Sequence, residues 1–366
     1  MFLALRDIRF AKGRFLLMAG VVALITLLLV LLSGLTAGLG NQSVSAIRSL
    51  GATADAIAFG APGVEAPNAS FTESQVTAGQ VLQWRQADGV EHAEPVGIGQ
   101  ARMAARGSAN VAVFGLEPGG LLAPAPVDDG LAVLSRTAAE DAGAGIGGRI
   151  ELGGVPFTVA AVVGDQWYSH TPVVWTSLEA WQEVAHLAGA GTPGGPVATA
   201  VAVVLDDRNA DGPAARRANA DAHTTTTSVT GAFQALGSYK SENGSLVLMQ
   251  GFLYGISALV IVAFLSVWTI QRTRDIAVLK ALGGSEGYLL RDALAQAAVV
   301  LAAGAVAGGT AGVLGGLAAG QAAPFLLTPA TTLLPVAGIV LLGLAGALLA
   351  VRRVARVDPL AALGGS

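Results

Sequence analysis

Cysteine is absent from this chain of 366 residues, and charged residues are scarce. Without cysteine there is no disulfide, thiolate metal site or cysteine nucleophile, so any exposed domain depends on its own hydrophobic core. Charged residues make up 13% of the sequence, whereas a soluble domain averages about 25%. Hydrophobic residues reach 53%. This composition indicates a membrane protein.

The chain also lacks a phosphate-binding loop of the GxxxxGK[ST] type, because the dipeptide Gly-Lys occurs nowhere in it. Any ATP chemistry must therefore come from a partner chain. Gly143-x-Gly145-x-x-Gly148 matches the dinucleotide fingerprint. That motif should follow a strand and open a helix, but here a helix-like segment precedes it and a strand follows. We interpret it as a turn.

No enzyme active site is predicted from the sequence. The four histidines, His92, His170, His186 and His223, show no metal-ligand spacing such as HxxxH. The segment from Trp167 to His170 is the most suggestive, because it places aromatic surface beside a histidine. The alternative is an ordinary surface loop.

Four apolar runs are long enough to cross a bilayer, which takes about 20 residues. The first could be read as a signal peptide, but it is longer than a typical apolar core and no clear A-x-A cleavage site ends it. We therefore expect an uncleaved first span. The runs extend over Phe15 to Leu35, Leu246 to Ile270, Ala293 to Ala319 and Leu333 to Val351.

The distribution of charge predicts the topology. Residues 41–243 carry 20 acidic and 10 basic residues, whereas the rest of the chain carries 5 and 11. The basic residues lie before the first run, between the second and third, and after the fourth. Because basic residues favour the cytoplasmic side, we expect both termini in the cytoplasm. An acidic domain of this kind is not expected to bind nucleic acid.

These observations divide the chain into nine segments. We expect transmembrane helices at 15–40, 244–270, 289–319 and 333–351. An extracytoplasmic α+β domain at 41–243 lies between helices 1 and 2, and an extracellular link occupies 320–332. A cytoplasmic amphipathic helix at 1–14, a charged segment at 271–288 and a tail at 352–366 complete the chain.

Glycines in the spans favour close helix packing. Gly304, Gly308, Gly312 and Gly316 recur every four residues in the third span and make one helix face nearly flat. The alternative is a general bias toward alanine and glycine. Gly34-x-x-x-Gly38 near the end of the first span predicts a second close helix contact.

The charged segment between the second and third spans reads QRTRDIAVLKALGG from Gln271 to Gly284. It combines basic side chains with aliphatic positions for one side of a short helix, and Gly283-Gly284 favours a helix end. Such a helix must lie at the membrane surface or against a partner. The alternative is an ordinary basic loop. The residues expected to contact a partner are Arg272, Arg274, Asp275, Ile276, Leu279 and Lys280.

This segment, together with the order of the spans, resembles permeases of the MacB/FtsX type, which are the membrane subunits of one class of ABC transporter. The resemblance implies that the segment is a coupling helix docking on an ABC ATPase made as a separate chain. It also implies a homodimer of the permease, two ATPase copies that bind ATP-Mg, and a multi-pass location in a bacterial plasma membrane.

The domain at 41–243 is expected to have mixed secondary structure. Helices are predicted at Thr72 to Gln86 and Leu178 to Leu187, and Asp206 to Pro213 is expected to be a polar turn region. Strands are predicted where valine is frequent. They are Val111 to Gly115, Arg149 to Leu152, Phe157 to Val163, Val173 to Thr176 and Ala198 to Leu205.

Candidate substrate residues lie just outside and within the start of the second span. Tyr239, Glu242 and Met249 fall near one helix face, and these residue types can ligate iron or pack on haem. The alternative is a tyrosine interface belt on an ordinary span surface. The chain resembles the smaller family members, which include haem exporters, so we expect haem export with Glu242 as the metal ligand. Export of a peptide, drug or lipid, lipoprotein extraction, and mechanotransmission to an envelope enzyme without transport are the alternatives.

Overall fold

The computed structural model of the chain describes residues 12–63, 65–187, 189, 191–271, 286–320 and 323–355. They belong to two compact units: a helix unit, Met1–Leu39 with Ser245–Ser366, and a sheet unit, Gly40–Gly244. The expected amphipathic helix at 1–14, coupling segment at 271–288 and tail at 352–366 lie largely outside the described residues.

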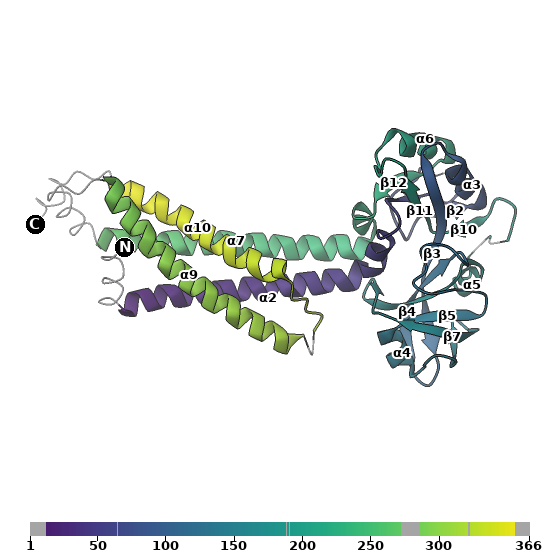
Figure 1. Ribbon diagram of the computed structural model, residues 1–366, viewed down its shortest axis with the longest axis horizontal. Helices are drawn as coiled ribbons and strands as arrows, with labels where there is room; N and C mark the ends of the chain where they lie inside the picture. Colours follow the sequence, from purple (N-terminus) through teal and green to yellow (C-terminus); the bar gives the residue numbers. More distant parts are fainter. Residues whose placement is uncertain are drawn as a thin grey trace, which may run out of the picture. The chain divides into compact units, whose positions relative to one another are not determined.

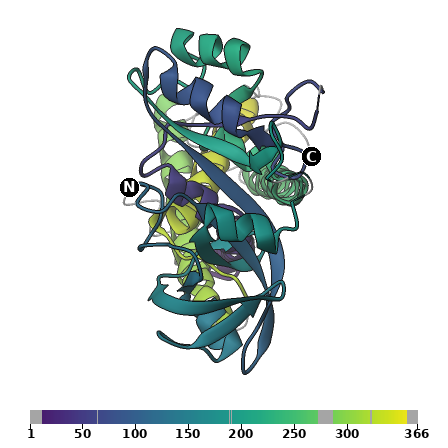
Figure 2. The ribbon, with the colours of Figure 1, turned by 90° about the vertical axis from the view of Figure 1, so that its right-hand side faces the viewer.

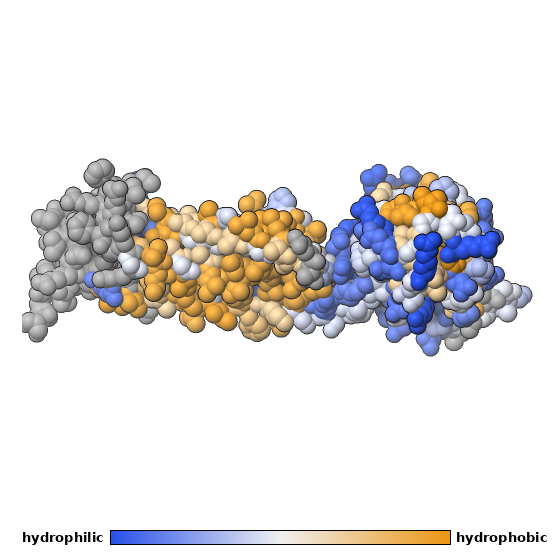
Figure 3. Space-filling model, turned by 90° about the horizontal axis from the view of Figure 1, so that it is seen from below, coloured by the Kyte–Doolittle hydropathy of each residue, from blue (hydrophilic) through white to orange (hydrophobic). Residues whose placement is uncertain are grey.

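Four long helices contain the four apolar runs. They are α2 (Lys12–Leu50), α7 (Gly237–Gln271), α9 (Glu286–Ala319) and α10 (Pro329–Ala355) (Figure 1). Each is long and apolar enough to cross a membrane, and apolar residues cover most of their visible surface (Figure 3). Apolar side chains on the outside of a helix bundle are stable when the solvent is lipid. The predicted class of membrane protein with four transmembrane helices is confirmed.

The glycine ladder of the third span packs against the first span. A Cβ atom added at Gly304 would lie 2.7 Å from the carbonyl oxygen of Ala19, and one at Gly312 would lie 2.8 Å from Cγ1 of Val30. At Gly308 the added atom would overlap the carbonyl oxygen of Ala23. The prediction of a flat helix face is confirmed, and its partner is α2.

Gly34 and Gly38 of α2 have a different partner from the one expected. Added Cβ atoms would overlap the ring of Phe325 and the carbonyl oxygen of Pro324. The backbone N–H of Leu326 also donates to the carbonyl oxygen of Gly34, at 3.0 Å. These glycines therefore admit the extended link between α9 and α10, and the expected contact with another helix is wrong.

The sheet unit contains one ten-stranded sheet, in the order β12-β1-β11-β3-β4-β9-β5-β7-β6, with β8 paired to β9. An additional pairing of β3 with β6 closes the last six strands of that order into a barrel. The long strand β3 is shared by the barrel and the open part of the sheet, and Figure 2 shows it crossing the whole unit. A separate two-stranded sheet joins β10 and β2.

The strands have the following bounds: β1 Ala56–Phe59, β2 Val76–Thr77, β3 Val90–Ala104, β4 Ser108–Leu116, β5 Leu131–Ser135, β6 Arg149–Leu152, β7 Val155–Val163, β8 Trp167–Tyr168, β9 Thr171–Ser177, β10 Pro196–Ala198, β11 Ala200–Leu205 and β12 Thr225–Ser228. The helices of the unit are α3 Ala78–Gln86, α4 Arg136–Ala142, α5 Leu178–Val184 and α6 Pro213–Ala222, followed by a short 3-10 helix, η1, at Gly231–Ala235.

Three hydrophobic clusters hold the sheet unit together. One joins α3 and α6 to the open sheet around the fully buried Trp84. A second joins α4 and α5 to the barrel strands, where Trp181 covers Gly97 and Gly115 so closely that any Cβ there would overlap its atoms. The third contains Val44, Ile47 and Leu50 from the last turns of α2. The end of α2 is therefore part of the core of the sheet unit.

Each predicted strand overlaps an observed strand, but several other predictions need correction. The expected helix from Thr72 begins only at Ala78, because Val76–Thr77 pairs with β10 and Thr77 forms a capping box with Gln80. The expected strand from Ala198 to Leu205 is divided at Thr199, whose hydroxyl bonds to the backbone of Ile98. The expected helix from Leu178 to Leu187 ends at Val184. The turn region at Asp206 gives way to α6 at Pro213.

Candidate functional site

The beginning of α7 and the last turns of α2 are joined by one hairpin turn of the sheet unit. The turn is Ser169-His170, between β8 and β9, and Tyr168 pairs with Thr171 across it. Both turn residues have positive φ, 49° for Ser169 and 64° for His170. Two such residues match a type I′ hairpin, which normally carries Asn or Gly. A left-handed backbone is unusual at serine and histidine, and it is typical of positions where the side chains have a functional contact.

His170 links α2 to α7. Its Nε2 atom lies 2.9 Å from Oε2 of Glu242 and 3.2 Å from Oγ of Ser43. Ser43 is buried, whereas the side chains of His170 and Glu242 are 36% and 30% exposed. Oγ of Ser169 lies 3.3 Å from Oγ of Ser238 at the start of α7. Five polar side chains from three segments therefore meet here.

The Ser43, His170 and Glu242 side chains do not form a catalytic triad. In a triad the imidazole uses one ring nitrogen for the nucleophile and the other for the carboxylate. Here both contacts are made by Nε2, and the Ser43 hydroxyl is buried. The arrangement instead suits a hydrogen bond between His170 and Glu242 that fixes the position of the carboxylate.

The structure brings two of the three candidate substrate residues together. Tyr239 and Glu242 are three positions apart on α7 and so share a helix face. The Tyr239 ring packs edge-on against Phe233 with centroids 6.0 Å apart, and it borders the core cluster of the sheet unit. Met249 belongs to the helix unit, and its side chain is 55% exposed.

The partner of Glu242 could not be found from the sequence. The segment from Trp167 to His170 is suggestive in the sequence, but 72 positions separate His170 from Glu242. Among the described residues, no three His, Asp or Glu side chains are grouped closely enough to hold a metal ion. A metal bound at Glu242 would therefore need other ligands, as iron held in a porphyrin has.

The six coupling residues, Arg272 to Lys280, lie outside the described part of the chain.

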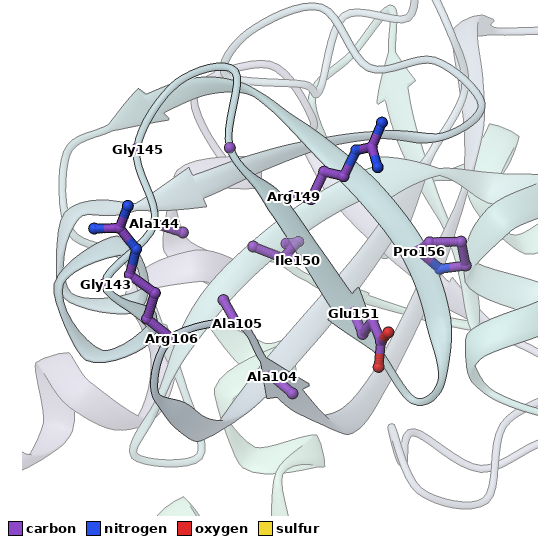
Figure 4. Close-up of a pocket in the computed structure, with 11 residues that line it drawn as sticks. Ala104, Ala105, Arg106, Gly143, Ala144, Gly145, Arg149, Ile150, Glu151 and Pro156 are labelled. Carbon is purple, nitrogen blue, oxygen red and sulfur yellow. The ribbon is translucent and has the colours of Figure 1, made fainter.

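A polar cleft of about 650 Å³ lies beside Gly143-x-Gly145-x-x-Gly148. The motif joins α4 to β6, and Gly143 is the left-handed C-cap of α4. The prediction of a turn is confirmed. Arg106 and Arg149 line the cleft, but Figure 4 shows their side chains pointing in different directions. They do not converge on one point, as the ligands of a bound phosphate would.

Two family models match the chain in succession. Residues 15–221 match the MacB-like periplasmic core domain, and residues 247–359 match the FtsX-like permease C-terminal domain. The first match alone covers more than half of the chain.

Individual relatives are more distant. The hemin transport system permease protein HrtB of Staphylococcus haemolyticus is 34% identical over 130 residues, and that of Staphylococcus epidermidis is 29% identical over the same length. Each match covers 36% of this chain and only 37% of the relative. An uncharacterized ABC transporter permease of Mycobacterium tuberculosis is 25% identical over 377 residues, which cover 100% of this chain and 99% of the relative.

Solved structures resemble the chain weakly. The extracellular domain of the noncanonic ABC-type transporter YknZ from Gram-positive bacteria gives a TM-score of 0.33 with 16% identity, covering 47% of this chain and 97% of that domain. The periplasmic region of MacB from Actinobacillus actinomycetemcomitans gives 0.36 with 12% identity, covering 51% and 94%. The assignment rests on the two family matches and the four apolar helices. The chain belongs to the MacB/FtsX-type family of ABC transporter permeases.

Proposed function

We propose that this permease exports haem from the outer leaflet of a bacterial plasma membrane. It acts as a homodimer with two copies of an ABC ATPase, which bind ATP-Mg and hydrolyse the nucleotide. Both termini and the segment at 271–288 face the cytoplasm. The permease performs no ATP chemistry itself and converts closure of the ATPases into motion of its helices.

The observation that carries this proposal is the position of Glu242. Its carboxylate is partly exposed and lies on the same helix face as Tyr239, four residues before the apolar run that begins at Leu246. Haem is a flat apolar ring with an iron ion and two carboxylates. A carboxylate ligand next to an apolar helix surface suits such a molecule, and Tyr239 and Met249 supply further contacts. The similarity to proteins named as hemin permeases supports the same substrate.

The proposed coupling depends on the segment at 271–288. Ile276 and Leu279 supply the apolar contact with the ATPase, and Arg272, Arg274, Asp275 and Lys280 supply the polar contacts. A short helix with these residues cannot enter lipid, because its charges would lose hydration there. It is therefore available for docking on a cytoplasmic protein.

Titration of the purified permease with haemin, followed through the Soret band, tests the substrate. We expect a saturable shift that weakens in Glu242→Ala, Tyr239→Ala and Met249→Ala. Lys240→Ala is the matched control, because it changes an exposed residue of the same helix turn. His170→Gln separates loss of the contact between the imidazole and Glu242 from loss of the carboxylate itself. A wild-type protein that gives no shift contradicts haem export and favours a peptide, drug or lipid, or mechanotransmission without transport.

Copurification with the ATPase tests the coupling segment. We expect Ile276→Asp and Leu279→Asp to abolish the complex, because a buried unpaired carboxylate is strongly unfavourable at an interface. The same substitutions should leave haemin binding by the isolated permease unchanged. Retention of the complex by both variants contradicts the assigned docking surface.

A further inference from the structure

We propose that the Ser169-His170 turn is a clasp that fastens the start of α7 to the end of α2, and that its α7 half opens during the ATPase cycle. The inference rests on the proposed coupling of the permease to an ATPase, but it does not depend on the substrate. Every residue of the clasp lies within the sheet unit, Gly40–Gly244.

The α2 half of the clasp is made largely by the backbone. The N–H groups of Ser169 and His170 donate to the carbonyl oxygens of Ser43 and Gln42, each at 3.0 Å. The Trp167 N–H donates to Oγ of Ser45 at 2.8 Å. Neighbouring residues of α2, among them Val44 and Ile47, are fully buried in the core. This half is therefore firmly attached, since its opening would expose the core and leave polar backbone groups unpaired.

The α7 half consists of side-chain contacts at the surface. It contains the His170–Glu242 pair and the Ser169–Ser238 pair. Both pairs are accessible to water, which can replace their hydrogen bonds when they separate. The Tyr239 ring adds a contact with Phe233, which also lies 5.5 Å beneath the Arg48 guanidinium of α2. The two halves therefore differ in strength, and separation is expected on the α7 side.

The turn is held in its strained conformation by a buried neighbour. Tyr168 is 5% exposed, and its ring packs edge-on against Phe114 and Phe71 with centroid distances of 5.7 and 6.1 Å. The Thr171 hydroxyl also donates to the Tyr168 carbonyl oxygen at 2.7 Å. Residues with positive φ persist only where surrounding contacts fix them. Here they hold the imidazole against Glu242, a role that Asn-Gly, the favoured sequence for this turn, could not fill.

The position of α7 in the chain allows the clasp to control how motion of the ATPase is transmitted. At its other end α7 runs directly into the proposed coupling segment, so movement of the ATPase acts on α7 before it reaches the sheet unit. A closed clasp makes the sheet unit follow α7 together with α2. An open clasp lets α7 move separately. The clasp therefore determines when motion from the cytoplasm is passed to the sheet unit.

Disulfide trapping tests the clasp in a chain that has no cysteine of its own. The Oγ atoms of Ser169 and Ser238 are 3.3 Å apart, so Ser169→Cys with Ser238→Cys needs only a small adjustment to reach an S–S bond of about 2.05 Å. The full permease–ATPase complex is oxidised in lipid nanodiscs, once without nucleotide and once trapped with ATP and vanadate. Each single-cysteine variant serves as the control for nonspecific oxidation.

We expect rapid disulfide formation without nucleotide and formation slower by at least about fivefold in the trapped complex, the lower end of typical coupling factors. Equal rates in the two states, or no disulfide in either, overturn the proposal. In the oxidised complex, ATP hydrolysis should be lost and should return on reduction. Full activity of the oxidised complex also overturns it.

The paired variant Ser169→Asn/His170→Gly keeps the turn but removes the clasp side chains. We expect it to bind the ATPase normally and to hydrolyse ATP at a rate different from that of the wild-type complex. An unchanged rate contradicts the proposal. The nucleotide-dependent disulfide rate requires no substrate, so a failure of haemin to bind would refute haem export and leave the clasp result intact.

Discussion

Gly308→Ala should weaken the packing of α9 on α2. The glycine faces the Ala23 backbone, where an added Cβ would overlap the carbonyl oxygen and lie 2.8 Å from Cα. Backbone atoms cannot move away as a flexible side chain can, so the two helices must separate locally. Overpacking of this kind costs about 1–3 kcal/mol. Alanine also favours a helix over glycine, by about 1 kcal/mol, which offsets part of that cost.

Gly315→Ala on the same helix is the matched control. Its Cβ would meet Cδ2 of Leu31 at 3.5 Å, an ordinary van der Waals contact. Both substitutions gain the same helix propensity, so their difference isolates the steric cost. We expect Gly308→Ala to be less stable than Gly315→Ala by about 1–3 kcal/mol. This corresponds to a melting temperature lower by roughly 2–4 °C per kcal/mol for a unit of this size.

A single introduced cysteine can report melting of the helix unit, because the chain contains no other thiol. Val300→Cys is suitable, since Val300 of α9 is 4% exposed and cysteine is smaller than valine. Reaction of this thiol with a fluorogenic maleimide during heating follows the loss of packing in detergent. Equal melting temperatures for the two alanine variants would refute the assigned α2–α9 contact. A lower value for Gly315→Ala would refute it as well.

Three further predictions concern the sheet unit. Burial raises the pKa of the Tyr168 hydroxyl well above its ordinary value of 10. As the pH rises, this tyrosine therefore ionises in the unfolded chain before it ionises in the folded one. The stability contributed by the neutral hydroxyl is complete below pH 10 and falls as the pH rises above it. Chemical denaturation between pH 8 and 11 should show this loss in the wild type and less of it in Tyr168→Phe, and equal losses would contradict it. Trp181→Ala should lower the free energy of unfolding by about 3–5 kcal/mol. In a double-mutant cycle, Trp181→Ala should relieve the penalty of Gly97→Ala, because the indole occupies the place of the added methyl. Additive penalties would exclude this contact. Thr77→Ala removes the capping box of α3 and should cost about 0.5–2 kcal/mol in the same denaturation experiment, whereas an unchanged midpoint would show that the cap does not contribute.

Sequence patterns identified the elements whose causes are local. The four spans follow from runs of apolar residues, and the valine-rich strands follow from side chains that suit a pleated surface. The strand β3 was not predicted, because Pro95, Gly97 and Gly99 interrupt its pattern. Gly97 and Gly99 make room for Trp181, which lies more than 80 positions away in the chain. The reason for these glycines is therefore a tertiary contact that no local pattern contains.

The same distinction between local and tertiary causes applies to the residues of the candidate site. Glu242 and Tyr239 were identified because helical spacing places them on one face ahead of a span. The aromatic neighbours of His170 make it a candidate in the sequence. Its contact with Glu242, however, depends on a hairpin that brings distant segments together. Gly34 and Gly38 resembled a helix-packing motif, yet they accommodate the link at Pro324 and Phe325. The spacing of small residues predicts a close approach without identifying the partner.

The barrel of the sheet unit limits where a strand of another protein can pair with the sheet. A strand that is hydrogen-bonded to a neighbour on both sides has no free backbone groups, so the barrel gives an incoming peptide little opportunity to extend the sheet. At the other end of the strand order, β12 pairs with β1 and has no second neighbour among the strands that the structure describes. Its four residues, Thr225 to Ser228, are all polar. Strand addition at this end of the sheet would therefore take place along a short border of polar, mostly threonine residues.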